Sequence, residues 1–400
     1  MNETNTNEAV NKLVYILIVI LYSSFYIFVG ETWGIYVIAS LISVILGLSI
    51  LVSQGKICFE KNWIYLFTCV FAIFCYLSSF WAWNGGLAKE KGKTIIEILI
   101  CIIVIGMWTR YDGDFLHKIK IVMWSGYLVT IYSIVKYNPF VLMSALASGL
   151  RFGITATNGV AMLISLSIII NIYDIIENKM KIWNLLMIPA FFLMAILGSR
   201  TSFIMLIVGI GLIIALRSSQ DRNILYSAIK VLLSLVLFIV VLYFLSKLPA
   251  LGMLEERMKG LIALFNGRGI IDSSAMLRKT YMDLALEQFK MNPILGIGIG
   301  NSLILTGQNS PFSTYIHNNF LELLACGGIV GFSLFYVMYG YAIFKYIKNH
   351  NKYNKHKVLM ISILLVVLMG DYGTVSYYLK STYTLLLFIY QYIESLPQNK

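Results

Sequence analysis

The chain contains 400 residues, of which 59% are hydrophobic and only 12% are charged, and its mean hydropathy is +0.79. Soluble domains carry about a quarter charged residues, and one soluble core could not hide this much apolar surface, whereas a lipid bilayer can. The composition therefore excludes a soluble domain and predicts an all-α membrane protein. The net charge of +12 does not indicate nucleic acid as a partner, because the basic residues stand in short clusters between apolar runs, as expected beside anionic membrane lipid.

Apolar runs recur along the whole chain, and a membrane-spanning helix needs about 17–25 such residues. The runs predict about twelve spans, at residues 13–29, 35–53, 63–80, 94–108, 119–135, 159–173, 182–197, 202–216, 224–245, 320–344, 358–370 and 382–393. The last two are short. We interpret the first run as a span and not as a removed signal peptide, because no small-residue cleavage site follows it.

The short loops indicate the orientation, since lysine and arginine concentrate on the cytoplasmic side. The basic residues favour a topology with both termini inside, although the cluster Lys89, Lys91 and Lys93 then falls outside. This topology divides the chain into residues 1–245 with nine spans, a large outward-facing loop at 246–316, and residues 317–400 with three spans.

The loop at 246–316 is too long for a passive connection. Two of its segments, 253–265 and 273–291, have the hydrophobic pattern of amphipathic helices. Asp272 or Ser273 is a suitable N-cap for the second helix, and Pro293 and Gly296 would end it. We expect helices in this loop and no separate soluble domain.

Two arginines stand out on the predicted outer side. Arg200 lies in Gly198-Ser199-Arg200-Thr201, between two spans that join through almost no loop. A charge at this depth is costly unless it is paired or faces a wet cavity. Arg200 is therefore either a snorkelling anchor or part of an anion site. Arg278 lies on the second loop helix, where it either binds an anion or is solvated among lipid headgroups.

The segment from Asn292 to Asn301 has glycines at 296, 298 and 300. It is no nucleotide-binding loop, because no strand precedes it and no P-loop lysine follows. We predict a turn whose bare amides approach another backbone or an anion. His317, at the start of the tenth span, is the only one of four histidines predicted at the outer edge of a long apolar helix. A lone histidine is usually structural, but these neighbours favour a functional role.

These features together resemble the O-antigen ligase/polymerase superfamily. The signature runs from the helix with Arg278 through NPILGIGIGN and a variable loop to HNNFLELLACGGIVGFSLF, over residues 278–335. The Gly198-Ser199-Arg200 hairpin is similar to the upstream arginine element of the family. The plan of about twelve spans, with a large outer loop between spans nine and ten, is similar over the whole chain.

The resemblance implies a glycosyltransferase of the C-type membrane fold in the bacterial cytoplasmic membrane. Its donor would be an undecaprenyl-diphosphate-linked oligosaccharide, used on the outer face. The resemblance assigns Arg200 and Arg278 to pyrophosphate binding and His317 to catalysis, with no cofactor and no metal. We expect support from Glu322, Asn318, Asn301, Gly296, Gly298 and Gly300. The family also implies a chain-length regulator as a partner.

This chemistry suits the residue types. Guanidinium groups stabilise the charge that develops on a diphosphate leaving group, and a histidine can accept the proton of the acceptor hydroxyl. An in-line attack would invert the anomeric centre. The string Asp112-Gly113-Asp114 could hold a metal in other enzymes, but here it falls in a predicted inner loop.

The sequence leaves three functions open. The first is a polymerase of lipid-linked repeat units, for a capsule, an exopolysaccharide or O-antigen. The second is a ligase that transfers the glycan to a lipid core, and it shares the same signature residues. The third is a transporter of lipid-linked glycan. It is disfavoured, because transporters place ionisable residues in mid-membrane and charges are nearly absent from the middle of these spans.

Overall fold

The computed structural model describes residues 3–27, 61–109, 114–148, 157–218, 273–310, 313–348 and 356–396. Helices joined by short connections make up these ranges, and no strand occurs within them. The predicted spans at 35–53 and 224–245, the amphipathic segment at 253–265, and Asp112 lie outside the described residues.

Six of the described helices are long and apolar enough to cross a membrane. They cover Trp63–Phe80, Gly85–Thr109, Phe115–Lys136, Thr157–Asn178, Arg200–Arg217 and Asn319–Lys348, and shorter apolar helices cover Lys12–Ile27, Ile182–Leu197 and Lys357–Gly370. For the part of the chain that the structure describes, the prediction of an all-α protein with several membrane-length helices is thereby confirmed. The total of about twelve spans and the division at residues 245 and 316 stay predictions.

The helices divide into two compact units. Unit 1 contains α1 (Glu3–Ile27), nearly all of α5 (Phe115–Lys136), α6 (Pro139–Ser148), α7 (Thr157–Asn178), η2 (Ile182–Leu186), α8 (Met187–Leu197), α9 (Arg200–Ser218) and α15 (Lys357–Gly370). Within it α7 packs against α8 and α9, and α9 packs against α15. Small hydroxyl residues allow close approach: Ser125 Oγ donates to Val19 O at 3.1 Å, and Ser167 Oγ donates to Val122 O at 3.1 Å.

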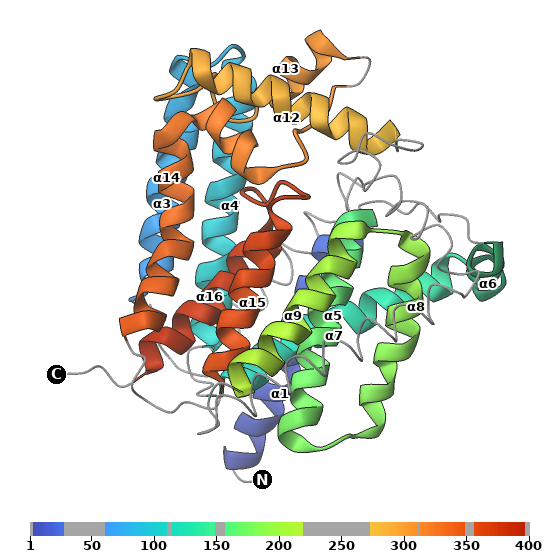
Figure 1. The fold of residues 1–400 in the computed structure, drawn as a ribbon. Helices are drawn as coiled ribbons and strands as arrows, with labels where there is room; N and C mark the ends of the chain where they lie inside the picture. The colour runs from blue at the N-terminus through green and yellow to red at the C-terminus, as the bar shows by residue number, and fades with distance from the viewer. Residues whose placement is uncertain are drawn as a thin grey trace. The chain divides into compact units, whose positions relative to one another are not determined.

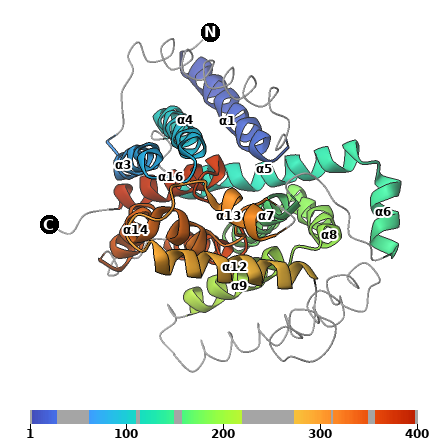
Figure 2. The ribbon, with the colours of Figure 1, turned by 90° about the horizontal axis from the view of Figure 1, so that it is seen from above.

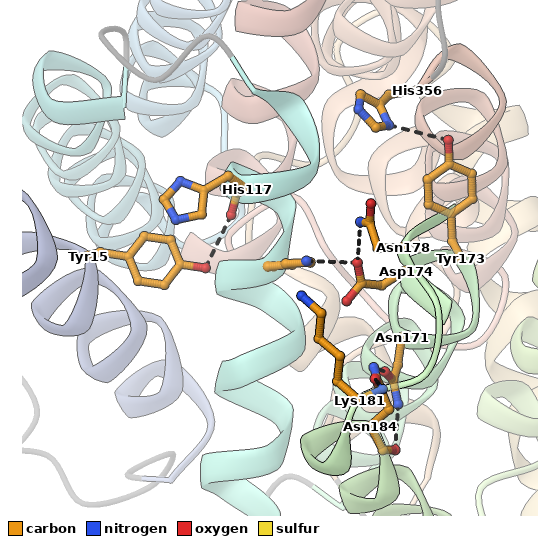
Figure 3. A network of polar contacts seen from close by, with 10 residues as sticks. Tyr15, His117, Asn171, Tyr173, Asp174, Asn178, Lys181, Asn184 and His356 are labelled. Atoms are coloured by element: carbon orange, nitrogen blue, oxygen red, sulfur yellow. Dashed lines mark hydrogen bonds and ion pairs between the residues drawn. The ribbon is translucent and has the colours of Figure 1, made fainter. Parts of the chain in front are cut away.

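Unit 1 also holds a polar network on α5, α7 and η2 (Figure 3). Lys120 Nζ lies 2.8 Å from Asp174 Oδ1, and Asn178 Nδ2 donates to the same carboxylate at 2.8 Å. Asn171 Nδ2 donates to the carbonyl of Asn184 at 2.9 Å. Asp174 is buried near the end of the apolar helix Thr157–Asn178, just beyond the predicted span at 159–173, and a charge there needs such partners. The network therefore ties the ends of these helices together.

Unit 2 contains α3 (Trp63–Leu77), η1 (Ser78–Phe80), α4 (Gly85–Thr109), α12 (Ser273–Met291), α13 (Ser302–Asn309), α14 (Asn319–Lys348) and α16 (Lys380–Ser395). Helix α3 packs against α4 and α14, and α16 packs against α3, α4 and α14. In Figure 1, α12 runs crosswise to α14, against which it packs, and Figure 2 shows it along its length.

Aromatic side chains form the core between the upright helices of unit 2. The ring centroids of Phe71 and Phe335 are 5.5 Å apart, and those of Phe335 and Tyr383 are 6.2 Å apart. Such tilted and edge-on pairs add stability beyond their buried area. This packing joins α3, α14 and α16, and it fixes where the first residues of α14 lie.

Local signals explain where several helices begin and end. Asn62 caps α3, because its side-chain oxygen accepts from Ile64 N–H at 3.1 Å. Helix α4 begins at Gly85 rather than at residue 94, so the lysines at 89, 91 and 93 lie on a helix and not in a loop. The apolar pattern alone could not predict this extension, since glutamate and lysine propagate a helix without being apolar.

Candidate functional site

Within unit 2, the segments predicted to face outward gather at one end. The turn that follows η1 contacts the turn at 292–301: Trp83 N–H donates to Ile297 O at 3.1 Å, and Asn84 N–H donates to Asn301 Oδ1 at 2.7 Å. The loop at 371–379 joins the same end, because Asn319 N–H donates to Asp371 O at 2.7 Å. The candidate site lies here, around the first turn of α14.

His317 precedes α14 in an unusual backbone conformation. Asn318 caps the helix as an N-cap residue, since its Oδ1 accepts from Leu321 N–H at 3.1 Å. His317 itself has φ +61°, in the left-handed region that non-glycine residues rarely adopt and that recurs at functional sites. Its imidazole packs at a tilt against Tyr315, with ring centroids 4.1 Å apart and 48° between the ring planes.

The imidazole of His317 is half-buried and is kept neutral by its surroundings. Its Nδ1 is buried without a hydrogen-bond partner among the described residues. Burial, together with the positive charge of Arg278, lowers the pKa of His317 to about 4. At neutral pH the imidazole is therefore uncharged, and one of its two nitrogens can accept a proton.

Arg278 is held near His317 by the packing of α12 on α14. Tyr281, Ala285 and Gln288 form the buried stripe of α12, and Arg278 stands three residues before Tyr281 on the same stripe. The hydroxyl of Tyr281 lies 3.0 Å from Ser310 Oγ, which joins α12 to the end of α13. Arg278 is half-buried at the edge of this contact.

Glu322 lies one turn into α14 and is 1% exposed. Its carboxylate accepts from Ser302 Oγ on α13 and, at 2.8 Å, from the N–H of Ile316. Ile316 is the neighbour of His317, so Glu322 holds the segment that carries the histidine against α14. The predicted supporting role of Glu322 thus has a geometric basis, although its contribution to activity stays a prediction.

Asn319 is a structural residue that the sequence alone did not single out. Its Oδ1 accepts from the N–H groups of Ser376 and Tyr377, at 2.9 and 3.1 Å. Its Nδ2 donates to the hydroxyl of Tyr336 at 2.8 Å, and that hydroxyl donates to Asp371 Oδ2 at 3.0 Å. Burial raises the pKa of Asp371 to about 7. This side chain clamps the loop after α15 to the start of α14.

The glycine-rich turn approaches other backbone, which is one of the two alternatives predicted for it. Gly296, Gly298 and Gly300 all have positive φ, of +64°, +92° and +80°. Ile297 N–H donates to Ala325 O at 3.1 Å, and Asn301 Nδ2 donates to Gly298 O at 3.1 Å. The turn is therefore packed between η1, α4 and α14, with Asn301 bracing it.

Helix α14 opens at Gly328 to receive this turn. Gly328 has φ +61° inside the helix, and the freed N–H groups of Ile329 and Val330 donate to Pro293 O and Ile294 O at 2.8 and 3.3 Å. A Cβ atom on Gly328 would lie 2.2 Å from Ile294 O. Only glycine fits here, because both the backbone conformation and the close approach exclude a side chain.

We expect Gly328→Ala to destabilise the protein, by about 1–3 kcal/mol from the backbone conformation alone, with the clash against Ile294 adding to this. Gly340 on the same helix is the matched control, since a Cβ there would meet nothing within 4 Å. Thermal unfolding of the purified proteins in detergent checks the prediction. Equal melting temperatures for G328A and G340A would contradict it.

Lys91 also lies at this end of unit 2, although the sequence predicted it only as a basic residue of an outer loop. It is half-buried on α4, and its Nζ lies 3.9 Å from the centroid of the Tyr378 ring. A signal was present in the sequence: Lys91 falls in register with the buried residues Ala88, Ile95 and Ile98 of α4. That register becomes visible only when the helix is known to begin at Gly85.

Arg200 belongs to unit 1, whereas Arg278 and His317 belong to unit 2. The predicted tight hairpin is confirmed: Gly198 ends α8 with φ +61°, and α9 begins at Arg200 itself. Ser199 is buried and accepts from Ser202 Oγ at 2.9 Å. Arg200 is half-buried, and its role in anion binding stays a prediction.

Chemically, the site in unit 2 combines a neutral buried imidazole with a guanidinium. Such a pair can accept a proton and stabilise a nearby anion. At this end the cations Arg278 and Lys91 stand with two buried carboxylates, Glu322 and Asp371, whose oxygens accept from protein groups. The arrangement favours an anionic ligand.

Comparison with known proteins agrees with the motifs. Residues 182–336 match a family model described as O-Antigen ligase. The matched segment contains Arg200, Arg278 and His317. No curated protein matches the chain. The chain is thus a multi-pass membrane protein whose residues 182–336 are similar to the O-antigen ligase family, in agreement with the superfamily predicted from the motifs.

Proposed function

We propose that this protein polymerises polyprenyl-diphosphate-linked oligosaccharide repeat units into a surface polysaccharide. The reaction would be an inverting glycosyl transfer on the outer face of the bacterial cytoplasmic membrane. The observation that carries the proposal is the buried, unpartnered Nδ1 of His317 beside the positive charge of Arg278. The similarity of residues 182–336 to the O-antigen ligase family supports the reaction class.

In the proposed reaction, a hydroxyl of the acceptor sugar attacks the anomeric carbon of the donor. The new C–O bond forms as the bond to the diphosphate breaks, and the diphosphate leaves with the electron pair. The imidazole of His317 takes the hydroxyl proton. Arg278 stabilises the charge on the leaving group, and the family resemblance assigns Arg200 the same task.

The low pKa of His317 is consistent with a base that becomes active only when the donor is bound. In the unliganded protein, burial and Arg278 keep the imidazole neutral. A bound diphosphate would offset the charge of Arg278 and raise the pKa of the imidazole towards neutral. His317 would then become a stronger base when the donor is in place, which is the condition under which a base is needed.

Deletion of the gene tests the function directly. The strain is complemented with wild type, and lipid-linked and surface glycans are separated on a gel. Single repeat units in the deletion strain, and a ladder restored by wild type, are the expected result. Long chains left on the polyprenyl carrier, with none on a lipid core, would instead identify a ligase.

The residue assignments are tested in the same strain with Arg200→Gln, Arg278→Gln and His317→Ala. We expect each variant to leave single repeat units while the protein remains in the membrane at wild-type amounts. Long-chain product in all three variants would overturn the proposed site. Transport of lipid-linked glycan that survives all three would favour the transporter.

A further inference from the structure

We propose that Lys91 is a further substrate-binding residue, which contacts the diphosphate of the lipid-linked substrate. The inference rests on the proposed function for its substrate class. In a polyprenyl-diphosphate-linked glycan the diphosphate is the anionic group present whatever the sugars are. A lysine ammonium is a compact point charge that suits phosphate oxygens.

The position of Lys91 is not that of a solvated surface lysine. It lies in register with the buried stripe Ala88, Ile95 and Ile98 of α4 and is half-buried, whereas Lys89 and Lys93 are exposed. Removing part of a charged side chain from water is unfavourable without compensation. Of the three lysines in this short segment, only the middle one is half-buried and faces the site.

Two other segments shape the place that Lys91 occupies. Its ammonium lies over the ring of Tyr378, 3.9 Å from the centroid, in the loop that Asn319 clamps to α14. On the other side, a Cβ atom at Gly300 would lie 2.9 Å from Lys91 Cγ. The absence of a side chain at Gly300 therefore leaves room for the lysine stem.

The ammonium lacks an oxygen partner within the part of the chain that the structure describes. The aromatic face of Tyr378 attracts it but accepts none of its three N–H groups in a conventional hydrogen bond. Glu322 attracts it electrostatically, yet no ion pair between them forms, and the Glu322 oxygens accept from Ser302 and Ile316. A ligand with anionic oxygens would supply the missing acceptors.

Electrostatic coupling places Lys91 in the same cluster as His317. Glu322 interacts with Lys91 and with Tyr378. Tyr315, whose ring packs at a tilt against His317, is affected by both charges: burial raises the pKa of Tyr315, Arg278 lowers it and Glu322 raises it. Lys91 and Arg278 therefore belong to one continuous group of side chains around the first turn of α14.

The test measures binding of farnesyl diphosphate, a short polyprenyl diphosphate, to the purified full-length protein in phosphatidylcholine nanodiscs. We expect Lys91→Gln to weaken binding by about 10-fold or more, the effect of losing one charge-assisted contact. Lys89→Gln and Lys93→Gln are matched controls with the same loss of charge, and we expect them to change binding less than about two-fold. Arg278→Gln serves as the positive control.

The outcomes separate the proposal from the function on which it rests. Unchanged binding in K91Q, with binding lost in R278Q, would overturn the role of Lys91 and leave the proposed function intact. No binding by wild type would count against both. The double variant Lys91→Gln, Glu322→Gln tests whether Lys91 serves only to balance the charge of Glu322. Normal binding in this double variant would show that it does, and this would also overturn the proposal.

A second measurement uses the wild-type protein, so it does not depend on the folding of a variant. Lysines are acetylated with and without farnesyl diphosphate, and the modification of each is quantified by mass spectrometry. We expect the ligand to protect Lys91 several-fold and to leave Lys89 and Lys93 unprotected. Equal protection by phosphatidylglycerol without farnesyl diphosphate would assign Lys91 to a lipid headgroup and overturn the proposal.

Discussion

Replacing His317 by alanine is expected to slow chain extension by about 10²–10⁴-fold, the usual contribution of a positioned general base. The imidazole nitrogen is buried without a partner, and its pKa of about 4 keeps it unprotonated at neutral pH. Alanine leaves no group on this segment that can accept the hydroxyl proton. Farnesyl-diphosphate binding should change little, because the imidazole is neutral and Arg278 remains.

The measurement is the rate of extension of lipid-linked repeat units by purified protein, with donor binding measured in parallel. His117→Ala is the control for loss of an imidazole, since His117 stacks on Tyr15 in unit 1, with ring centroids 4.5 Å apart. We expect near-normal rates in H117A. A rate in H317A within a few-fold of wild type would rule out His317 as the base.

The pH profile gives an independent check on the same residue. The neutral imidazole is the active form, so kcat/KM should stay level down to about pH 5 and fall as the pH drops through the value near 4. Arg278→Gln removes one of the two causes of the low pKa of His317. The acid limb of the profile should therefore move to higher pH in R278Q, with burial accounting for the part of the shift that remains.

Arg278→Gln is expected to lower kcat by about 10²–10³-fold, which is the cost of removing one group that stabilises developing negative charge. Arg278→Lys should recover only part of this loss, because an ammonium cannot bind a phosphate group in the bidentate manner of a guanidinium. The effect should exceed that of a surface charge, since Arg278 is half-buried and acts on His317 directly.

Lys279 provides the matched control, as it is the next residue on α12 and is exposed. Lys279→Gln changes the net charge by the same amount, and we expect it to leave kcat within about two-fold, as for other exposed charges. Rates and farnesyl-diphosphate binding are measured for all three variants. Equal losses in R278Q and K279Q would mean that only the overall charge of α12 matters.

The sequence by itself determined the class of the protein and the family to which residues 182–336 are similar. Long continuous apolar runs indicate membrane-spanning helices, because lipid can cover them and a helix satisfies its backbone groups within the same segment. The motif around His317 and the hairpin at Arg200 are continuous in sequence, so their residue types could be read directly. Helix starts that depend on one cap, such as Asn62, were also close to the predicted bounds.

Only the tertiary structure decided which polar residues meet. Lys91, Gly300 and Tyr378 are far apart in the chain, and their contact follows from the packing of α4, the glycine turn and the clamped loop. The opening of α14 at Gly328 is likewise invisible in a hydropathy pattern, which averages over whole turns. The periodicity of apolar residues shows which face of a helix is buried. It does not show which hydrogen-bond partner each buried polar group has, because that depends on which segments lie close together in space. Asn319 illustrates the difference, since its four hydrogen-bond partners come from α14 and from the loop after α15.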